Sequence, residues 1–415
     1  MYALGAILVS LLALVLLLRL KVRIGKAMTI SAVLLAVLLR VTPGEMGAYL
    51  AAEWRDRPFM ETTPYLFVSL TVLLLLVNVV GEAMNQIGLS ARLVPAMHGL
   101  FRSRRVALAA IPLVMGLLPT PGGIMLSAPM VREAGDKMGV ERSRLAAINF
   151  FFRHQWEPIW PLFPAVPLIV TMLSISPGRI VAYHAALATA GLIGGIVFLL
   201  LTGIPPRRAE HMEARASIAS HVKDLVLVFW PIVFTAALYV KLDVPPAVGI
   251  FFAILGLLLF HRVGVHRWAG IFRAAREADI VLLLFGALWF KLNLEAGGAV
   301  EAVVAFFQQI HMPSKLVVFL LPFLVSFSTG VTTPTVAITY PFLMPFIQKG
   351  GDTLLGVETL AFAGVVFGLA ISPIHLCLAL SASYFNAPLL RIILRVLPAA
   401  LWVVAAGIAM ALLAP

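Results

Sequence analysis

The stretch SFSTGVTTPT, residues 326–335, interrupts an apolar segment that runs from 314 to 346. LPTPGGIM, residues 118–125, interrupts a second one, which runs from 106 to 130. Residues 106–118 would make only ~20 Å of helix, whereas a bilayer needs ~30 Å. Irregular backbone at membrane depth is tolerated only where it is buried in protein or lines a wet cavity. Both segments are therefore predicted to turn back as re-entrant hairpins.

The rest of the chain has the composition of a membrane protein. Of its 415 residues, 61% are hydrophobic and 12% are charged. The apolar residues fall in blocks long enough to cross hydrocarbon as helices. The predicted full spans are residues 2–18, 27–41, 64–82, 145–172, 180–202, 224–241, 246–261, 278–294, 358–382 and 388–413. The fold class predicted is an all-α polytopic membrane protein of about ten full helices, two of them broken, plus the two hairpins.

The net charge of +12 is distributed by the positive-inside rule, so nucleic acid is not predicted as a partner. If the basic segment 19–26 is cytoplasmic, 22 of the 31 Lys and Arg residues fall inside, and six, or seven with Arg40, fall outside. Both termini are then outside. The expected location is the inner (cytoplasmic) membrane. The first block has no basic residue before it, so it is expected to be retained rather than cleaved.

The chain also repeats itself in order. The Thr-Pro pairs at 120 and 333 are 213 residues apart, and so are the Glu-Ala pairs at 82 and 295. The orientation above puts the first hairpin on the cytoplasmic side and the second on the outside. Two inverted repeats are therefore predicted, residues 1–202 and 224–415, joined by a basic cytoplasmic linker at 203–223.

Each hairpin tip is a candidate binding site. In both, a Thr precedes a Pro, which is the N-cap and N1 pattern that begins a helix. Helix N-termini carry free N–H groups and favour an anion. The alternative is that small residues only allow close packing and that the prolines only kink helices. The candidate residues are Thr120, Pro121, Gly122 and Gly123 in the first tip, and Ser328, Thr329, Gly330, Thr332 and Thr333 in the second.

The span 145–172 carries the densest intramembrane polarity. Asn149, Arg153 and Glu157 are four residues apart and would share a helix face, beside His154. Prolines then follow at 158, 161, 164 and 167, so a regular helix is not expected to continue. The freed carbonyls would suit a small cation or the donors of a substrate.

The span 358–382 is predicted to break at Ser372-Pro373, with His375 just beyond. Several alternatives stay open for these polar groups. Arg153 and Glu157 could be a structural ion pair, or could contact substrate. His154 and His375 could couple transport to pH, or only join helices by hydrogen bonds. Lys291, near a span end, is expected to extend toward the interface.

PTPGGIMLSAPMV at 119–131, RHQWEPIWPLFP at 153–164, TGVTTPT at 329–335 and SPIHLCLAL at 372–380 resemble the prokaryotic membrane family filed as domain of unknown function 401. That family is placed in the ion transporter superfamily, with divalent-anion/sodium symporters and citrate, gluconate and arsenite carriers. The resemblance implies substrate held between hairpin tips and broken helices, a homodimer and elevator-like movement. The Ser-Asn-Thr tip signature of the dicarboxylate symporters is absent, so neither their specificity nor their sodium sites carry over.

The predicted function is secondary active transport of a small anion, with an organic carboxylate as the favoured class, coupled to Na⁺ or H⁺. A cation/proton antiporter that uses Glu157 and the histidines is the alternative. A membrane-embedded enzyme is disfavoured because the sequence has no H-E-x-x-H, no G-x-S-x-G and no cysteine cluster, and without a Walker A sequence a primary pump is disfavoured too. No cofactor and no metal other than a coupling Na⁺ is expected, and the partners are lipid, the anion and a second copy of the chain.

Overall fold

A computed structural model describes residues 2–414 except 90, 91, 93–95, 98, 99, 101, 102, 118–123, 203 and 205–217. Within these residues the chain is helical apart from turns and one small hairpin, in which β1 (Gln348–Lys349) and β2 (Asp352–Thr353) pair antiparallel. The prediction of an all-helical chain is confirmed. Most of the linker at 203–223 lies outside the described residues, and its last part, from 218 onward, begins a helix.

Among the described residues, the first half of the chain forms nine α-helices and three short segments of other helix types, and the second half forms ten α-helices. In the first half these are α1 (Tyr2–Arg19), α2 (Ile24–Leu39), α3 (Pro43–Asp56), η1 (Phe59–Glu61), α4 (Thr63–Gln86), α6 (Arg104–Met115), α7 (Ile124–Asp136), α8 (Arg142–Arg153), η2 (His154–Trp156), α9 (Ala165–Leu173), α10 (Pro177–Gly195) and η3 (Ile196–Leu201). In the second half they are α11 (Ile218–Leu242), α12 (Pro246–Phe260), α13 (Val265–Ala274), α14 (Ala278–Ala296), α15 (Ala299–Gln309), α16 (Ser314–Thr329), α17 (Thr332–Ile347), α18 (Leu355–Ile371), α19 (Leu376–Phe385) and α20 (Leu389–Leu413).

Six helical stretches of the described chain are long and apolar enough to cross a membrane. They are α1, α4, α10 with η3, α11, α18 with α19, and α20. The count rises to eight if two bent pairs, α2 with α3 and α14 with α15, are each taken as one span. These helices are those of a membrane protein, and the count of ten spans stays a prediction.

Each bent pair contains a helix, α3 or α15, that lies outside the spans predicted from the sequence. α3 turns 105° away from α2, and α15 turns 72° away from α14. α3 begins with a capping box, in which Glu45 N donates to Thr42 Oγ1 over 3.2 Å and Thr42 N donates to Glu45 Oε2 over 2.8 Å. Pro43 occupies its first position, where no N–H is needed. The T-P-G-E signal at 42–45 was legible in the sequence.

The two predicted helix breaks are confirmed. α8 ends at Arg153, and after η2 the chain follows turns until α9 begins at Ala165. Prolines at 158, 161 and 164 remove donors through this stretch. α18 ends at Ile371 and α19 begins at Leu376, on either side of Pro373.

α16 and α17 pack against each other and are joined by a tight turn at Gly330. Gly330 adopts a left-handed conformation with φ +67°, which ends α16 as a C-cap. The sequence prediction that Thr333 caps the following helix is wrong, because the N-cap is Val331 and the helix begins at Thr332. Pro334 is thus the third helical residue, still within the first turn, where the N–H groups have no partner inside the helix.

Small residues bring α18 close to α16. A Cβ on Gly364 would lie 2.4 Å from Phe319 O, and one on Gly368 would lie 2.5 Å from Phe323 O. The two glycines are four residues apart on one face, the G-x-x-x-G spacing that lets membrane helices approach closely. α18 therefore holds the hairpin α16–α17 through backbone contact.

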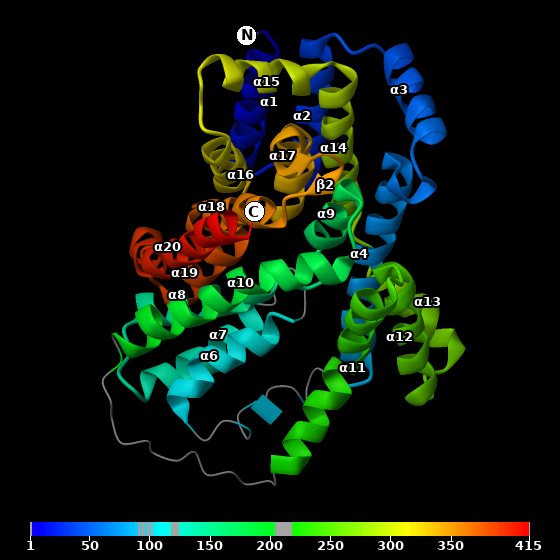
Figure 1. Ribbon diagram of the computed structural model, residues 1–415. Helices are drawn as coiled ribbons and strands as arrows, with labels where there is room; N and C mark the ends of the chain where they lie inside the picture. Colours follow the sequence, from blue (N-terminus) through cyan, green and yellow to red (C-terminus); the bar gives the residue numbers. More distant parts are fainter. Residues whose placement is uncertain are drawn as a thin grey trace.

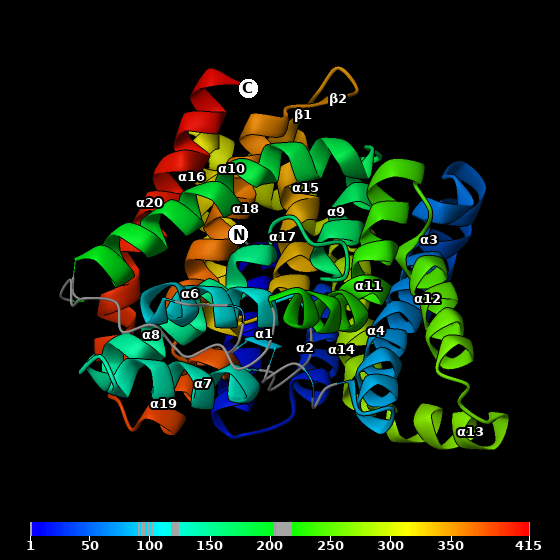
Figure 2. The same ribbon diagram turned by 90° about the horizontal axis from the view of Figure 1, so that it is seen from below.

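Figures 1 and 2 show two groups of helices on opposite sides of the molecule. α11, α12 and α13 lie beside α4 on one side, and α8, α19 and α20 lie together on the other. In the first group α1 packs on α2, α11 on α12, α2 on α14 and α12 on α4. In the second, α6 packs on α8, α16 on α18, and α10 on α20.

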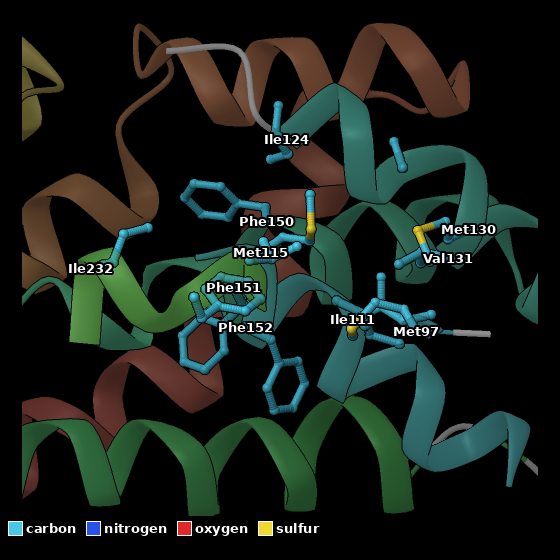
Figure 3. Close-up of a cluster of buried hydrophobic side chains, with 14 of the residues drawn as sticks. Met97, Ile111, Met115, Ile124, Met130, Val131, Phe150, Phe151, Phe152 and Ile232 are labelled. Carbon is cyan, nitrogen blue, oxygen red and sulfur yellow. The ribbon is translucent and has the colours of Figure 1, made fainter. Parts of the chain in front are cut away.

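Two hydrophobic cores join the helices, and each takes side chains from both groups. One gathers side chains of α4, α6, α7, α8, α12 and the C-terminal helices, and the other gathers side chains of α1, α2, α9, α14, α17 and α18. Figure 3 shows part of the first, where Met115 of α6, Ile124 of α7 and Phe150 of α8 point toward one another. The first hairpin is thereby packed against the helix that leads into the first break.

Candidate functional site

The C-terminal end of α6 lies against the first break. Arg153, the last residue of α8, donates from Nη1 to Met115 O over 2.7 Å. Trp156 Nε1 donates to Leu113 O over 2.7 Å. A Cβ on Gly116 would lie 2.2 Å from Arg153 O, so the backbones touch where the first hairpin enters its tip. The carbonyls at the end of α6 are satisfied by side chains from the break.

The turn of the second hairpin lies against the second break in a similar way. His375 Nδ1 lies 2.6 Å from Gly330 O, and Ser372 Oγ donates to Phe327 O over 2.7 Å. A Cβ on Gly330 would lie 2.9 Å from His375 Cα. Each break is thus covered by one hairpin of its own half of the chain.

The two breaks meet. His154 Nε2, from the first, lies 3.2 Å from His375 Nε2, from the second. The side chain of Cys377, in the first turn of α19, places its sulfur within 4.8 Å of both imidazoles. Phe150 packs under the pair, with ring centroids 4.7 Å from His154 and 5.3 Å from His375. We call this point, defined by His154, His375 and Cys377, the break junction.

Arg153 and Glu157 are both buried near the junction, within electrostatic range of Cys377. Arg153 is anchored to the end of α6. Glu157 Oε2 is buried and has no hydrogen-bond partner among the described residues. The two side chains lie within electrostatic range of each other, so a structural role and a substrate role both stay open for them.

Asn149 is fully buried and joins three helices. Its Oδ1 accepts from Ser127 Oγ of α7 over 2.6 Å, and its Nδ2 donates to Ser381 Oγ of α19 over 3.3 Å. It thus ties the first hairpin to the second broken helix. Asn149 therefore connects helices by hydrogen bonds. The sequence had suggested a binding role for it, because it shares a predicted helix face with Arg153.

The candidate residues of the two tips have different outcomes. Thr120, Pro121, Gly122 and Gly123 lie outside the described residues. Thr329 is buried and its Oγ1 lies 3.3 Å from Thr335 Oγ1. Thr332 and Thr333 are buried in the first turn of α17, and Ser328 is half-buried near the end of α16. The second tip is therefore polar and inaccessible in this conformation.

A second buried network was missed by the sequence analysis. His184 Nδ1 lies 2.7 Å from Pro158 O, and its Nε2 lies 2.8 Å from Glu358 Oε2. Tyr340 donates to Glu358 Oε1 over 2.7 Å. A carbonyl only accepts, so Nδ1 carries a proton, and a second proton must lie between His184 Nε2 and the carboxylate. The sequence offered one signal for this network, because His184, Tyr340 and Glu358 are polar residues within predicted apolar segments.

Lys291 does not extend to the interface. It is 3% exposed and donates to Glu295 Oε2 over 2.7 Å, with Glu53 Oε1 3.7 Å away. Tyr49 also donates to Glu295, over 2.9 Å. The prediction was wrong because α3, which supplies Glu53 and Tyr49, had not been recognised as a helix.

One apolar cavity lies away from the break junction. Its volume is about 920 Å³, and it is lined by apolar residues of α2, α3, α4 and α14, such as Phe67 and Trp289. A second cavity of about 460 Å³ has charged walls that include Arg57, Arg179 and Asp352. It lies between helices of the two groups. Neither of these two cavities is lined by a residue of the breaks.

One family model, described as protein of unknown function DUF401, matches residues 4–414. The chain belongs to the DUF401 family. The match covers nearly the whole chain, so the hairpins, the breaks and the junction all lie inside the DUF401 region. No curated protein matches this DUF401 member.

Proposed function

We propose that the protein is a secondary active transporter of a small anion, with organic carboxylates as the favoured substrates, coupled to Na⁺ or H⁺. The observation that carries the proposal is the meeting of two broken helices, each covered by a helical hairpin, at a buried polar point between the two halves of the chain. Broken helices that meet near mid-membrane at a repeat interface are where secondary transporters bind substrate.

The packing of the helices supports two repeats. If α1–α4 correspond to α11–α14 and α6–α10 to α16–α20, many contacts occur twice. The contact of α2 with α14 corresponds to that of α12 with α4. In the same way, the contact of α8 with α20 corresponds to that of α18 with α10, and the contact of α9 with α17 to that of α19 with α7. The contacts of α4 with α14 and of α10 with α20 each join two helices that correspond to each other. Two repeats related by a two-fold axis, as in inverted-repeat transporters, are expected to show such matching pairs of contacts.

The proposed topology follows the charge distribution, with both termini outside and residues 203–223 in the cytoplasm. The two hairpins then enter the inner membrane from opposite sides as re-entrant elements. Helices α1–α4 and α11–α14 form the scaffold, and α6–α10 with α16–α20 form the part that moves. The charged cavity between the groups suits a boundary along which one slides past the other. We propose this movement together with a homodimer formed through the scaffolds. We also propose that the protein is a member of the ion transporter superfamily.

The groups that would bind an anion come from both halves. Arg153 is the buried cation at the junction, 5% exposed. The N-terminus of α17 carries the buried Thr332 and Thr333, and the N-terminus of α19 follows His375 directly. Helix N-termini and a guanidinium are complementary to a carboxylate. The coupling ion would offset part of the charge that the membrane interior disfavours.

The test is a thermal-shift screen of the purified protein against small carboxylates and inorganic anions, with and without Na⁺ and at two pH values. A substrate raises Tm by mass action. We expect one class of anion to raise Tm only with Na⁺ or at the lower pH, and Arg153→Ala to abolish that shift. Arg267→Ala, at an exposed arginine of α13, is the matched control and should leave the shift unchanged. Uptake of the same anion into proteoliposomes then tests transport.

One observation favours a second candidate, a cation/proton antiporter. Glu157 has a buried carboxylate oxygen without a partner in the described chain, as expected of a group that exchanges a proton for a cation. In that case no anion shifts Tm, whereas Na⁺, K⁺ or pH alone does. Glu157→Gln would then abolish the cation-dependent shift. That outcome would overturn the anion proposal.

A further inference from the structure

The hydrogen bonds of the two junction imidazoles fix their tautomers. His154 Nδ1 lies 2.7 Å from Phe150 O, and His375 Nδ1 lies 2.6 Å from Gly330 O. Carbonyl oxygens only accept, so both Nδ1 atoms carry hydrogen. In a neutral imidazole the other nitrogen is then an acceptor. Two acceptor nitrogens therefore face each other across 3.2 Å.

Two opposed lone pairs at this distance need a positive centre that both can bind. Imidazoles that bind metal through Nε2 commonly donate Nδ1–H to a backbone carbonyl, which orients the ring. Two nitrogens at ~2.0–2.1 Å from one tetrahedral Zn²⁺ lie roughly 3.3–3.4 Å apart. The observed separation of 3.2 Å is close to that value.

The third group at the junction is a thiol. Cys377 Sγ lies within 4.8 Å of one ring nitrogen of each histidine and comes from the first turn of α19, two residues after His375. Sulfur and nitrogen on one Zn²⁺ lie about 3.5–3.6 Å apart, given bond lengths of ~2.3 and ~2.0–2.1 Å. A shift of about one ångström, within reach of a side-chain rotation, would complete the geometry. We propose that His154, His375 and Cys377 form a binding site for a borderline-soft transition metal of the Zn²⁺ class.

The surroundings fit such an ion. Glu157 lies within electrostatic range of Cys377, and its Oε2 is buried without a hydrogen-bond partner in the described chain. Its carboxylate is not one of the ligand atoms that lie within 4.8 Å of one another, so it becomes a fourth ligand only if its side chain moves toward them. A divalent ion with one thiolate, one carboxylate and two neutral imidazoles would then have no net charge, which reduces the penalty for burying it near the Arg153 guanidinium, which lies within electrostatic range of His154 and Cys377. Phe150 lies against both imidazoles and limits the access of water.

The site would join the two halves of the chain. His154 directly follows α8. His375, 221 residues later, directly precedes α19, and Cys377 lies in the first turn of α19. A bound metal would hold the two breaks together and thereby restrain both hairpins, because Gly330 and Gly116 contact the same breaks. The site depends on this geometry and not on the proposed transport of an anion.

The experiment titrates Co²⁺ and then Zn²⁺ into the purified, metal-stripped full chain in detergent. Cys377 is the single cysteine of the chain, so a thiolate-to-cobalt charge-transfer band can come from no other residue. We expect this band together with tetrahedral ligand-field bands, displacement of both by Zn²⁺, and protection of Cys377 from maleimide by Zn²⁺. Cys377→Ser should abolish the charge-transfer band.

Two histidine variants locate the site. His375→Asn should weaken Co²⁺ binding at least as much as the ~10–100-fold loss that follows removal of an outer-shell partner. His266→Asn, at an exposed histidine of α13, is the matched control and should bind Co²⁺ unchanged. If the wild-type chain gives no charge-transfer band and Zn²⁺ does not protect Cys377, the metal site is overturned and the two imidazoles share a proton instead. This wild-type result decides the matter even if a variant fails to fold.

Discussion

The two helix breaks meet at one point, yet they are built differently. The first lasts from His154 to Pro164, contains prolines spaced three apart, directly follows Arg153 and contains Glu157. The second lasts only from Ser372 to His375, contains one proline and has no charged residue. Both breaks touch the backbone of a hairpin at a glycine, Gly116 for the first and Gly330 for the second, but only the first carries buried charged side chains. The two breaks thus share a backbone contact and differ in the charged groups beside it.

The largest effect is expected where the long first break is tied to the second half. His184 bonds Pro158 O within the break and Glu358 at the start of α18, and both side chains are fully buried. His184→Phe should lower the free energy of unfolding by about 3–5 kcal/mol, because it leaves a buried carboxylate without its partner. Thermal unfolding in detergent measures this.

Glu358→Gln sharpens the same test. The amide can donate to a neutral imidazole and still accept from Tyr340, so we expect a loss below about 1 kcal/mol. As a control, Asp136→Asn in the exposed Arg132–Asp136 pair should cost about 0.2–1 kcal/mol. If His184→Phe costs no more than this control, the first break does not depend on the buried pair.

The next effect concerns the second break. Gly330→Ala should cost about 2–4 kcal/mol, from the strain of a left-handed backbone and from the Cβ that would lie 2.9 Å from His375 Cα. Gly350→Ala is the matched control, since its φ is +60° but nothing lies within 4 Å of the added Cβ. That change should cost about 1–2 kcal/mol. Equal Tm losses for the two variants would show that backbone contact does not hold the second break.

A smaller effect is expected at the corresponding contact of the first break. Gly116 has ordinary helical angles, so Gly116→Ala is disfavoured only by overpacking against Arg153 O, and should cost about 1–3 kcal/mol. Gly47→Ala, within α3 and with open space around it, should instead be neutral or stabilise by about 0.5–1 kcal/mol. A loss at Gly116 larger than that at Gly330 would reverse the comparison of the two breaks.

The smallest effect is at the entrance to the first broken helix. Ser143 donates to Glu141 over 2.6 Å, and this bond, together with the pair to Arg395 of α20, lowers the pKa of Glu141 below its ordinary value of 4.5. A lowered pKa stabilises the folded state above pH 4.5, and this stabilisation is lost as pH falls through the folded value. Because both groups are substantially exposed, we expect less than about 1 kcal/mol.

The measurement is Tm as a function of pH from neutral to acid, for the wild type and for Glu141→Gln. The variant should start slightly less stable at neutral pH and lose less on acidification. Parallel curves would assign no stabilising role to the Glu141–Arg395 pair. High salt should narrow the difference, since the pair is screened there.

Several features could be predicted because they depend on local chemistry. The Pro373 break and the end of α8 before Pro158 follow from the missing N–H groups of proline, and the turn at Gly330 follows from the conformational freedom of glycine. The first turn of α17 could not be placed correctly, because Pro334 is compatible with any of the first helical positions. Lys291 was misplaced because its partner Glu53 comes from a helix bent 105° away from its neighbour.

The sequence by itself determined that the chain is helical and apolar, where its helices break, and which polar residues lie within apolar spans, because backbone chemistry and hydrophobicity act locally. It did not indicate which side chains of the two breaks would meet. His154 and His375 are 221 residues apart, and their 3.2 Å contact exists only because α8, α19 and the two hairpins pack together. The same packing brought Cys377 to them and His184 to Glu358. Tertiary structure alone decided these pairings, because they join side chains that no local interaction relates.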